Sequence, residues 1–367
     1  MKIVVIGTRG IPDIQGGVET HCQELYPRLV KLGCEVILIT RKPYVKSQIS
    51  DYQGVRLKDI YAPKRKSLEA IVHTFLAILY AYGCKPDILH IHAIGPSLLV
   101  PFAKLLGMKV IITNHGPDYD RQKWGRSAKM ILRLGERLGT KYADGIIVIS
   151  KTIRGLVEKK YNRFDSNLIA NGVNIPEVVA TTDYIASLGL QPKNYVIGVG
   201  RFVPEKGFHD LSAAFAELGE TGCKLVLVGD ADHETEYSKE LKRVARVKNV
   251  VLTGFIRGSA LVEVFSHAKI FVMPSYHEGL PIALLEAMSY NLDVLVSDIP
   301  ANSEIELPEN CYFRTGDVVD LGVKLKTKLS QMHEIRDFRQ TIIEKYNWND
   351  IAEQTLRAYQ RLLSNIE

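Results

Sequence analysis

Short runs of β-branched and other apolar residues alternate with segments of helical periodicity along most of the chain. Within each run the apolar residues are consecutive, which is typical of parallel strands that are buried on both faces. Helical patterns, such as those at 19–32 and 97–106, separate the runs. In the first half of the chain the predicted strands are 2–8, 34–40, 88–93, 109–115 and 145–150.

The alternation stops in a polar stretch without periodicity and then resumes, with predicted strands at 195–201, 223–230, 249–255, 269–275 and 292–298. Two successive βα arrays indicate an α/β protein with two doubly wound, Rossmann-like domains that face each other. We predict domains at 1–175 and 193–348, a linker at 176–192, and a terminal helix at 349–367 that Asn349 caps and that packs back toward the first domain. Ligands bind such sheets at the carboxyl ends of the strands, so a shared ligand is expected in the cleft between the domains.

Composition narrows the class of protein further. The 367 residues carry a net charge of +6, which suits an anionic ligand or a membrane surface but does not require either. The five cysteines are scattered and show no paired spacing, so we expect reduced core thiols in a cytoplasmic protein rather than disulfides or a zinc site. The chain opens directly on a strand, which predicts no signal peptide. Its longest apolar run, 71–82, is shorter than the roughly 20 residues of a membrane span and predicts a buried or interfacial helix.

Paired glycines, Gly16 and Gly17, precede the first predicted helix. Glycines at this position let backbone N–H groups approach an anion without a Cβ in the way. A flexible turn between strand and helix explains the pair equally well. The spacing does not match the nicotinamide-dinucleotide fingerprint.

Two cations follow a strand in the second half, within the sequence "GRFVPEKGF". Arg201 ends the strand, and Lys206 lies in the loop that Gly207 closes. Arginine offers a planar fork and lysine a point charge, and together they suit a diphosphate. A solvated surface pair is the alternative, but the position at a strand end favours a ligand site.

The stretch "YHEGLPIALLEAMSYN" places Glu278 before a predicted helix and Glu286 inside it. Pro281 fits the first helical position, and the free N–H groups around Gly279 to Ala283 can point at an anion. A carboxylate repels a phosphate but accepts hydrogen bonds from hydroxyl groups. We therefore expect the two glutamates to bind polyol hydroxyls on either side of a phosphate site, rather than only to support the helix start.

Two further motifs lie in the first half. His115 stands at the carboxyl end of a predicted strand, where it is either a core residue or a donor in the cleft, and neither reading is favoured by the sequence. The Asn171-Gly172 pair tolerates left-handed backbone and is interpreted as a structural turn.

Taken in order, these motifs resemble the retaining glycosyltransferases of family 4, which have the two-domain GT-B fold. The resemblance covers nearly the whole chain. It rests on the Gly16-Gly17 loop with Glu19, "NHG" at 114–116, "NGV" at 171–173, "GRFVPEKG" at 200–207, "VGD" at 228–230, and the Glu278 and Glu286 pair. The opening "GTRGIP" with "GGVET" also looks like the bacterial branch that builds cell-surface polysaccharides.

The resemblance implies a nucleotide diphosphate sugar as donor, most simply a UDP or GDP sugar. Arg201 and Lys206 would neutralise the diphosphate, Glu286 would hold the ribose hydroxyls, and Glu278 with the backbone of Gly279 and Leu280 would hold the sugar. Gly17, after Gly16, would let its loop close over the phosphates, and His115 would contact the transferred sugar near its reacting carbon.

The chemistry expected from these residues is stabilisation of the departing diphosphate by Arg201, Lys206 and the helix N-terminus. No separate cofactor is expected, and no metal. No carboxylate is evidently placed as a nucleophile. The sequence therefore favours substitution on the same face of the sugar, in which the departing phosphate accepts the proton of the acceptor.

The expected acceptor is a hydroxyl of a glycan or a lipid-linked glycan. The segment from Arg121 to Lys141 is rich in cations and contains Trp124 and spaced apolar residues, which predicts a basic amphipathic helix. Such a helix either exposes a solvated face or docks on an anionic membrane that carries the acceptor. No nucleic-acid partner is expected.

Other functions fit the same fold. A nucleotide-sugar epimerase would need carboxylates poised for proton abstraction, and a phosphorylase would need a pyridoxal lysine site; neither is suggested by the sequence. A non-catalytic sugar-binding protein is disfavoured because Arg201, Lys206, Glu278 and Glu286 are all present.

Overall fold

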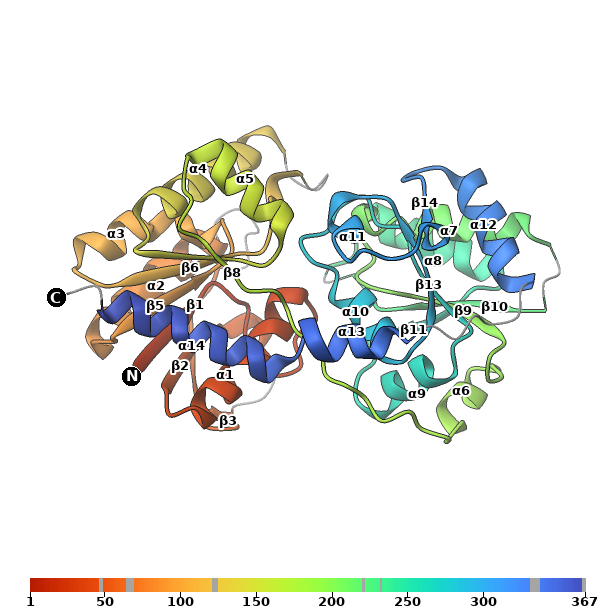
Figure 1. The fold of residues 1–367 in the computed structure, drawn as a ribbon, viewed down its shortest axis with the longest axis horizontal. Helices are drawn as coiled ribbons and strands as arrows, with labels where there is room; N and C mark the ends of the chain where they lie inside the picture. The colour runs from red at the N-terminus through yellow and green to blue at the C-terminus, as the bar shows by residue number, and fades with distance from the viewer. Residues whose placement is uncertain are drawn as a thin grey trace. The chain divides into compact units, whose positions relative to one another are not determined.

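The computed structural model of the chain describes residues 1–45, 49–63, 69–120, 125–219, 222–231, 233–330 and 337–364 (Figure 1). The chain forms two compact units. Unit 1 comprises Met1–Gly172 with Trp348–Glu367, and unit 2 comprises Val173–Asn347. Each unit is an open, mainly parallel sheet with helices packed on it, and this confirms the predicted doubly wound α/β fold.

The sheet of unit 1 has the strand order β3-β4-β2-β1-β5-β6-β7-β8 among the described residues. Its pairs are parallel except β3 with β4, which is antiparallel. The strands are β1 Lys2–Ile6, β2 Glu35–Arg41, β3 Asp51–Tyr52, β4 Val55–Ile60, β5 Ile88–His92, β6 Val110–Asn114, β7 Gly145–Val148 and β8 Asn167–Leu168. The five predicted runs coincide with β1, β2, β5, β6 and β7. The sequence pattern missed β3 and β8, which are two residues each, and β4, which is half polar.

The helices of unit 1 include the last helix of the chain, α14, which packs against α1 (Figure 1). Residues of α14 such as Ile351 and Tyr359 belong to the same apolar cluster as Leu25 and Tyr26 of α1. The α-helices are α1 Gly17–Lys31, α2 Glu69–Cys84, α3 Val100–Leu105, α4 Arg126–Tyr142, α5 Lys151–Tyr161 and α14 Trp348–Ser364, with short 3₁₀ helices η1 Lys42–Tyr44, η2 Pro96–Leu99 and η3 Asp118–Asp120.

Asn349 does not cap α14, because the helix already begins at Trp348. The Asn349 side chain instead accepts a hydrogen bond from Arg28 Nε of α1 at 3.2 Å. The prediction of an Asn cap is therefore wrong. The side-chain amide of Asn349, predicted to cap the helix, instead takes part in a contact between α14 and α1.

Unit 2 has a fully parallel sheet in the order β11-β10-β9-β12-β13-β14. The strands are β9 Tyr195–Val199, β10 Lys224–Val228, β11 Val251–Gly254, β12 Ile270–Met273, β13 Asp293–Ser297 and β14 Tyr312–Phe313. The helices are α6 Asp183–Ser187, α7 Phe208–Glu217, α8 Glu236–Val247, α9 Ser259–His267, α10 Ile282–Ser289, α11 Pro300–Ser303, α12 Val318–Ser330 and α13 Phe338–Lys345, with η4 Pro204–Lys206 and η5 Glu309–Cys311.

Residues 176–192 were predicted as a linker, but they belong to unit 2. They contain the short helix α6, in which Ile185 is fully buried and its N–H donates to Glu263 Oε1 of α9 at 2.9 Å. A helix of five residues is too short to show apolar periodicity, so the sequence pattern missed it.

The cysteines are all free, and Cys22, Cys34 and Cys311 are buried. Cys84 and Cys223, which were also expected in the core, are only partly buried. Among the helices that the structure describes, none is long and apolar enough to cross a membrane.

Candidate functional site

The loop after β9 is held tightly against the end of the neighbouring strand β12. It contains Gly200, Arg201 and the turn η4, and it closes at Gly207, whose φ of 63° lies in the left-handed region. A Cβ at Gly207 would collide with the carbonyl oxygen of Pro274 after β12. Only glycine combines this backbone with so close an approach. The loop therefore places Lys206 beside the segment that follows β12.

Lys206 and Glu278, 72 positions apart in the sequence, form an ion pair in which Lys206 Nζ lies 2.6 Å from Glu278 Oε1. Ser275 Oγ donates to the same carboxylate oxygen at 2.7 Å. The side chains of Lys206 and Glu278 are 20% and 12% exposed, so the pair is only partly hydrated. Two residues predicted to meet different parts of one ligand are thus brought together.

Tyr276 joins the same two segments a second time. Its N–H donates to the carbonyl of Glu205 at 2.8 Å, and its hydroxyl donates to Asp210 Oδ2 of α7 at 2.6 Å. Burial, together with the Asp210 carboxylate, raises the pKa of the Tyr276 hydroxyl to about 12, so it remains a donor at neutral pH.

Glu205 is a residue to which sequence reasoning assigned no role. Its side chain is buried, with 6% exposed, and neither carboxylate oxygen has a hydrogen-bond partner among the described residues. Burying a carboxylate without partners is unfavourable, so its presence beside Lys206 marks the loop as a site under functional constraint. The available signal was its position inside the "PEKG" motif.

The segment after Glu278 leads into α10, which begins at Ile282, so Pro281 is the N-cap residue rather than the first helical residue. The prediction was therefore displaced by one position. The carbonyl of Pro281 accepts from the N–H groups of Leu284 and Leu285 at 3.1 and 3.2 Å. As at any helix start, the first N–H groups have no intrahelical partner. Leu280 is buried, whereas Gly279 is partly exposed.

Glu286 lies in the middle of α10 and is partly buried, whereas Leu284 and Leu285 beside it are fully buried. Its carboxylate, after burial, is the second cause that raises the pKa of Tyr290 to about 12. Arg201 follows Gly200 directly and is also partly buried. Unit 2 therefore carries all the predicted donor-binding cations and carboxylates.

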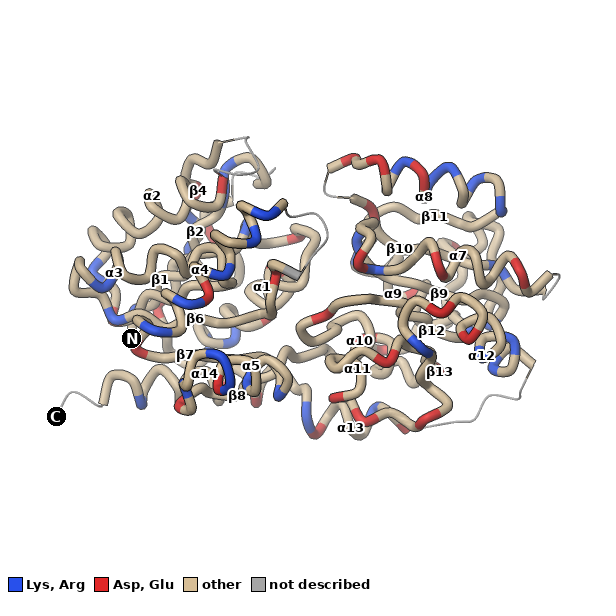
Figure 2. The backbone as a smooth tube through the Cα atoms, turned by 90° about the horizontal axis from the view of Figure 1, so that it is seen from above, with Lys and Arg blue, Asp and Glu red and all other residues tan. Residues whose placement is uncertain are grey.

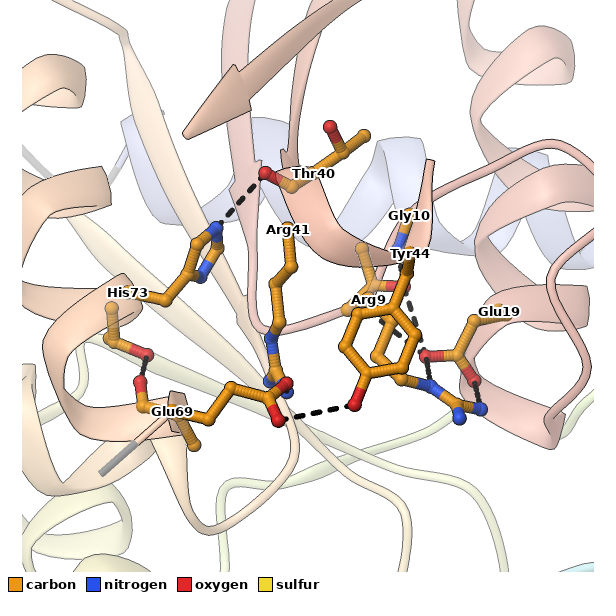
Figure 3. Close-up of polar contacts among 11 residues, drawn as sticks. Arg9, Gly10, Glu19, Thr40, Arg41, Tyr44, Glu69 and His73 are labelled. Atoms are coloured by element: carbon orange, nitrogen blue, oxygen red, sulfur yellow. Dashed lines mark hydrogen bonds and ion pairs between the residues drawn. The ribbon is translucent and has the colours of Figure 1, made fainter. Parts of the chain in front are cut away.

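In unit 1 the Gly16-Gly17 pair stands at the start of α1. Beside it Arg9 and Glu19 form an ion pair that the sequence did not predict (Figure 3). Glu19 accepts hydrogen bonds from Arg9 Nε, Nη2 and backbone N–H at 3.0–3.1 Å. Burial raises the pKa of Glu19, but Arg9 outweighs it and holds the pKa below its usual value. A Cβ at Gly16 would collide with both side chains, so this glycine makes room for the ion pair.

A second ion pair lies nearby at the end of β2 (Figure 3). Arg41 Nη1 is 2.8 Å from Glu69 Oε1, and the Tyr44 hydroxyl donates to Glu69 Oε2 at 3.1 Å. The guanidinium of Arg9 lies over the ring of Tyr44, 5.5 Å from its centre. His73 Nε2 lies 3.1 Å from the carbonyl of Thr40, and burial lowers its pKa to about 4.

His115 follows β6 and is half-buried at the edge of a histidine cluster in unit 1. Its Nε2 lies 3.0 Å from Nδ1 of His92, the last residue of β5. His21 of α1 packs on both rings, and its Nδ1 bonds the buried side chain of Asn171 at 2.9 Å. Asn171, interpreted from the sequence as a turn residue, thus also orients a histidine. Sequence reasoning missed His21, His90 and His92. The "HIH" pattern in β5 was a signal for His90 and His92 but not for His21.

His21, His92 and His115 are also a group that could hold a metal ion, because their ring nitrogens lie within 4.8 Å of one another. Neutral imidazole is a common metal ligand.

Comparison with known proteins assigns both units to one class of enzyme. A family model described as Glycosyltransferase Family 4 matches residues 15–176, and one described as Glycosyl transferases group 1 matches residues 181–347. An uncharacterised glycosyltransferase of Methanocaldococcus jannaschii is 26% identical, with 98% of each chain covered.

Two solved structures show the same fold. Sucrose-phosphate synthase from Thermosynechococcus elongatus has a TM-score of 0.85 at 23% identity and covers 99% of each chain. Anabaena HepE in complex with UDP-glucose has a TM-score of 0.77 at 16% identity and covers 100% of each chain. The chain is therefore a family 4 glycosyltransferase with the GT-B fold.

Proposed function

We propose that the chain transfers a hexose from a nucleotide diphosphate sugar to a hydroxyl group of a glycan or lipid-linked glycan, with retention of the anomeric configuration. The observation that carries the proposal is the meeting of Lys206 with Glu278 at the carboxyl ends of β9 and β12. This edge of a parallel sheet is where such folds bind ligands. Because HepE was solved with UDP-glucose, UDP is the first nucleoside diphosphate to test and GDP the second.

The proposed donor site lies in unit 2. Arg201 and Lys206 bind the diphosphate, and the first N–H groups of α10 add partial positive charge. Glu286 accepts hydrogen bonds from the ribose hydroxyls. Glu278, with the backbone of Gly279 and Leu280, binds the hydroxyls of the sugar.

Transfer breaks the bond between the anomeric carbon and the diphosphate oxygen, and the electron pair leaves with the nucleoside diphosphate. Arg201 and Lys206 lower the barrier by stabilising the charge that develops on that oxygen. The acceptor hydroxyl attacks from the face that the diphosphate leaves, and its proton passes to the departing phosphate. His115 of unit 1 contacts the sugar near the reacting carbon. A trapped glycosyl–enzyme adduct would contradict this same-face mechanism.

The test is a calorimetric titration with UDP, GDP, ADP and dTDP of the wild type, Lys206→Ala and a control, Lys239→Ala. Lys239 is an exposed lysine of α8 that pairs with Glu236. We expect one nucleotide to bind the wild type and the control, and to lose most of its affinity for Lys206→Ala. Unchanged binding to Lys206→Ala would show that the diphosphate lies elsewhere. Analysis of the sugar product then separates transfer from epimerisation, and the absence of turnover would indicate a binding protein.

We further propose that α4 docks the enzyme on an anionic membrane that carries the acceptor. Met130, Ile131 and Leu134 of α4 are exposed, although large apolar side chains are usually buried. Exposed cations lie along the same helix, namely Arg126, Arg133, Arg137 and Lys141 (Figure 2). Apolar side chains flanked by cations are the features of an interfacial helix. Arg121, Lys123 and Trp124, which the sequence prediction included, lie outside the described residues.

Co-sedimentation with phosphatidylglycerol vesicles tests this surface. We expect Arg137→Glu with Lys141→Glu to reduce binding at least about tenfold, since each basic residue near such a surface contributes about 1 kcal/mol. The control, Arg243→Glu on α8, should bind like the wild type. Equal binding of all variants, or equal binding to phosphatidylcholine vesicles, would contradict membrane docking through α4.

A further inference from the structure

A continuous set of hydrogen bonds runs through the core of unit 1 and ends at His115. His92 Nδ1 meets His115 Nε2 at 3.0 Å, and His92 Nε2 bonds the hydroxyl of Tyr26. The Tyr26 hydroxyl also bonds His90 Nδ1 at 3.0 Å, and the Tyr359 hydroxyl bonds the same nitrogen at 2.6 Å. His90 Nε2 then bonds Thr113 Oγ1 at 2.7 Å.

These groups come from four separate elements of unit 1. Tyr26 lies on α1, His90 and His92 on β5, Thr113 on β6, and Tyr359 on α14. Except at His115, the exposed fraction of every side chain in the set is 1% or less. The last helix of the chain thus reaches the centre of unit 1 and contributes a hydroxyl there.

The buried histidines of the set are uncharged at neutral pH. Both rings are fully buried, and the groups that bond them are hydroxyls and imidazoles rather than carboxylates, so a charged ring would be unfavourable there. A neutral imidazole has one N–H and one nitrogen lone pair. Each ring therefore donates at one nitrogen and accepts at the other.

This alternation ties the proton positions together. If His92 Nδ1 donates to His115, then His92 Nε2 must accept the proton of the Tyr26 hydroxyl, and His90 Nδ1 bonds the oxygen of Tyr26 or the hydroxyl of Tyr359. If His115 Nε2 donates to His92, then His92 Nε2 carries the proton and donates to the oxygen of Tyr26. His92 cannot change its tautomer without reversing its bonds to both His115 and Tyr26, since otherwise a buried donor or acceptor is left unpaired, which is unfavourable. Since Nε2 of His115 is engaged by His92, the set determines whether Nδ1 of His115 carries a proton.

We propose that His92, Tyr26 and Tyr359 are positioning residues that hold the His115 ring in one orientation and one tautomer for the transfer reaction. The inference rests on the proposed function, in which His115 contacts the transferred sugar. It adds a role for α14, since the packing of this helix supplies the Tyr359 hydroxyl. Hydrogen bonds to one imidazole nitrogen are a general means of setting the state of the other.

A double-mutant cycle tests whether Tyr26 acts through His115. We expect Tyr26→Phe to lower kcat about 10- to 100-fold, the effect of a small displacement of a reacting group, with little change in KM for the donor. In the His115→Ala background the same substitution should change kcat less than twofold, because no ring remains to be positioned. Equal losses in both backgrounds would overturn the proposal and indicate a structural role.

The matched control is Tyr195→Phe in unit 2. Tyr195 is a fully buried tyrosine whose hydroxyl donates to the backbone carbonyl of Val264 at 2.6 Å. Its loss removes a buried hydroxyl of the same kind without touching the histidines, and kcat should stay near the wild-type value. A loss of kcat equal to that of Tyr26→Phe would show that any buried tyrosine hydroxyl has this effect, and would overturn the proposal.

Nitrogen-15 NMR of the imidazole rings gives a readout that does not depend on catalysis. At pH 7 we expect His115 of the wild type to show one neutral tautomer, and the signals of its two nitrogens to shift in Tyr26→Phe. Unshifted signals would overturn the proposal. So would one zinc ion per chain that survives dialysis against a chelator and is lost in His92→Gln, because the metal would then occupy the nitrogens.

The proposal and the proposed function fail in different ways. If the wild type neither binds a nucleoside diphosphate nor transfers a sugar, the proposed function fails while the NMR result still decides whether the hydrogen bonds set the His115 tautomer.

Discussion

Lys206 Nζ lies 2.6 Å from Glu278 Oε1, and Ser275 Oγ donates to the same oxygen. In this state the carboxylate neutralises the cation that we assign to the diphosphate. Binding of the donor must therefore redistribute the partners of Lys206. We therefore expect the two glutamates of the motif to have opposite effects on nucleotide binding. Glu278 weakens it by pairing with Lys206, whereas Glu286 strengthens it by binding the ribose hydroxyls.

Glu278→Gln should strengthen the binding of a free nucleoside diphosphate, because it releases Lys206 from its ion pair. We expect about a fivefold lower Kd, equivalent to about 1 kcal/mol, measured by calorimetry. Turnover of the sugar donor should fall, because a glutamine amide accepts hydrogen bonds from the sugar hydroxyls less strongly than the Glu278 carboxylate does. Glu286→Gln, the paired variant, should instead raise the Kd. If both substitutions shift the Kd in the same direction, the assignment of the two carboxylates is wrong.

Glu205→Gln should stabilise unit 2 while reducing activity. The carboxylate is buried without a hydrogen-bond partner among the described residues, and an amide is less unfavourable to bury than a charge. We expect the free energy of unfolding to rise by about 1 kcal/mol and kcat/KM to fall about tenfold, the effect of one hydrogen bond to a charged group. Urea titration and donor kinetics measure the two quantities.

The control for this substitution is Glu263→Gln. Glu263 is also buried, with 6% exposed, but its Oε1 accepts from Ile185 N–H at 2.9 Å. This variant should lose stability and keep its activity. A loss of stability in Glu205→Gln of the same size would show that Glu205 has a structural partner after all.

Gly207→Ala should destabilise the loop after β9, and the loss of stability should exceed that expected from a left-handed backbone alone. A Cβ there meets the carbonyl of Pro274, in addition to the strain of φ 63°. At Gly219, φ is 70° but no atom of the described residues other than its chain neighbours would lie within 4 Å of a Cβ. We expect Gly219→Ala to lower the free energy of unfolding by about 1–2 kcal/mol and Gly207→Ala by more, with loss of nucleotide binding. Equal effects in urea titrations would mean that the loop can move away from β12.

The stability of unit 1 should fall as the pH is lowered from neutrality. Burial lowers the pKa of His21 and His73 to about 4 and that of His90 to about 3, against 6.5 when unfolded. Between these values the unfolded chain binds more protons than the folded one, so acid favours unfolding. Each ring should remove up to about 1.4 kcal/mol of unfolding free energy per pH unit below 6.5, until the pH reaches its folded pKa.

Substitution of one ring isolates this effect. His73→Gln should flatten the dependence of the free energy of unfolding on pH between about 6.5 and 4. His233→Gln, at an exposed position of unit 2, should leave the dependence unchanged. A pH dependence that is identical in His73→Gln and the wild type would show that His73 titrates normally in the folded state.

The strands were predictable because a parallel strand buried on both faces leaves an unbroken apolar run, as in 195–201 for β9 and 292–298 for β13. The short edge strands β3, β8 and β14 were not, because two residues carry no periodicity. Asn349 and Pro281 show a further limit. Local propensity suggested a cap and a first helical residue, but tertiary packing decided where α14 and α10 begin.

By itself the sequence determined the fold class and the motif residues of the proposed donor site, such as Lys206 and Glu278. Both depend on local spacing around strand ends, which a linear pattern records. Only the tertiary structure showed that Lys206 and Glu278 form an ion pair, and that Tyr359, near the end of the chain, is linked through buried hydrogen bonds to His92 and His115. Such contacts join residues from distant segments, and they exist only because sheet order and helix packing bring those segments together.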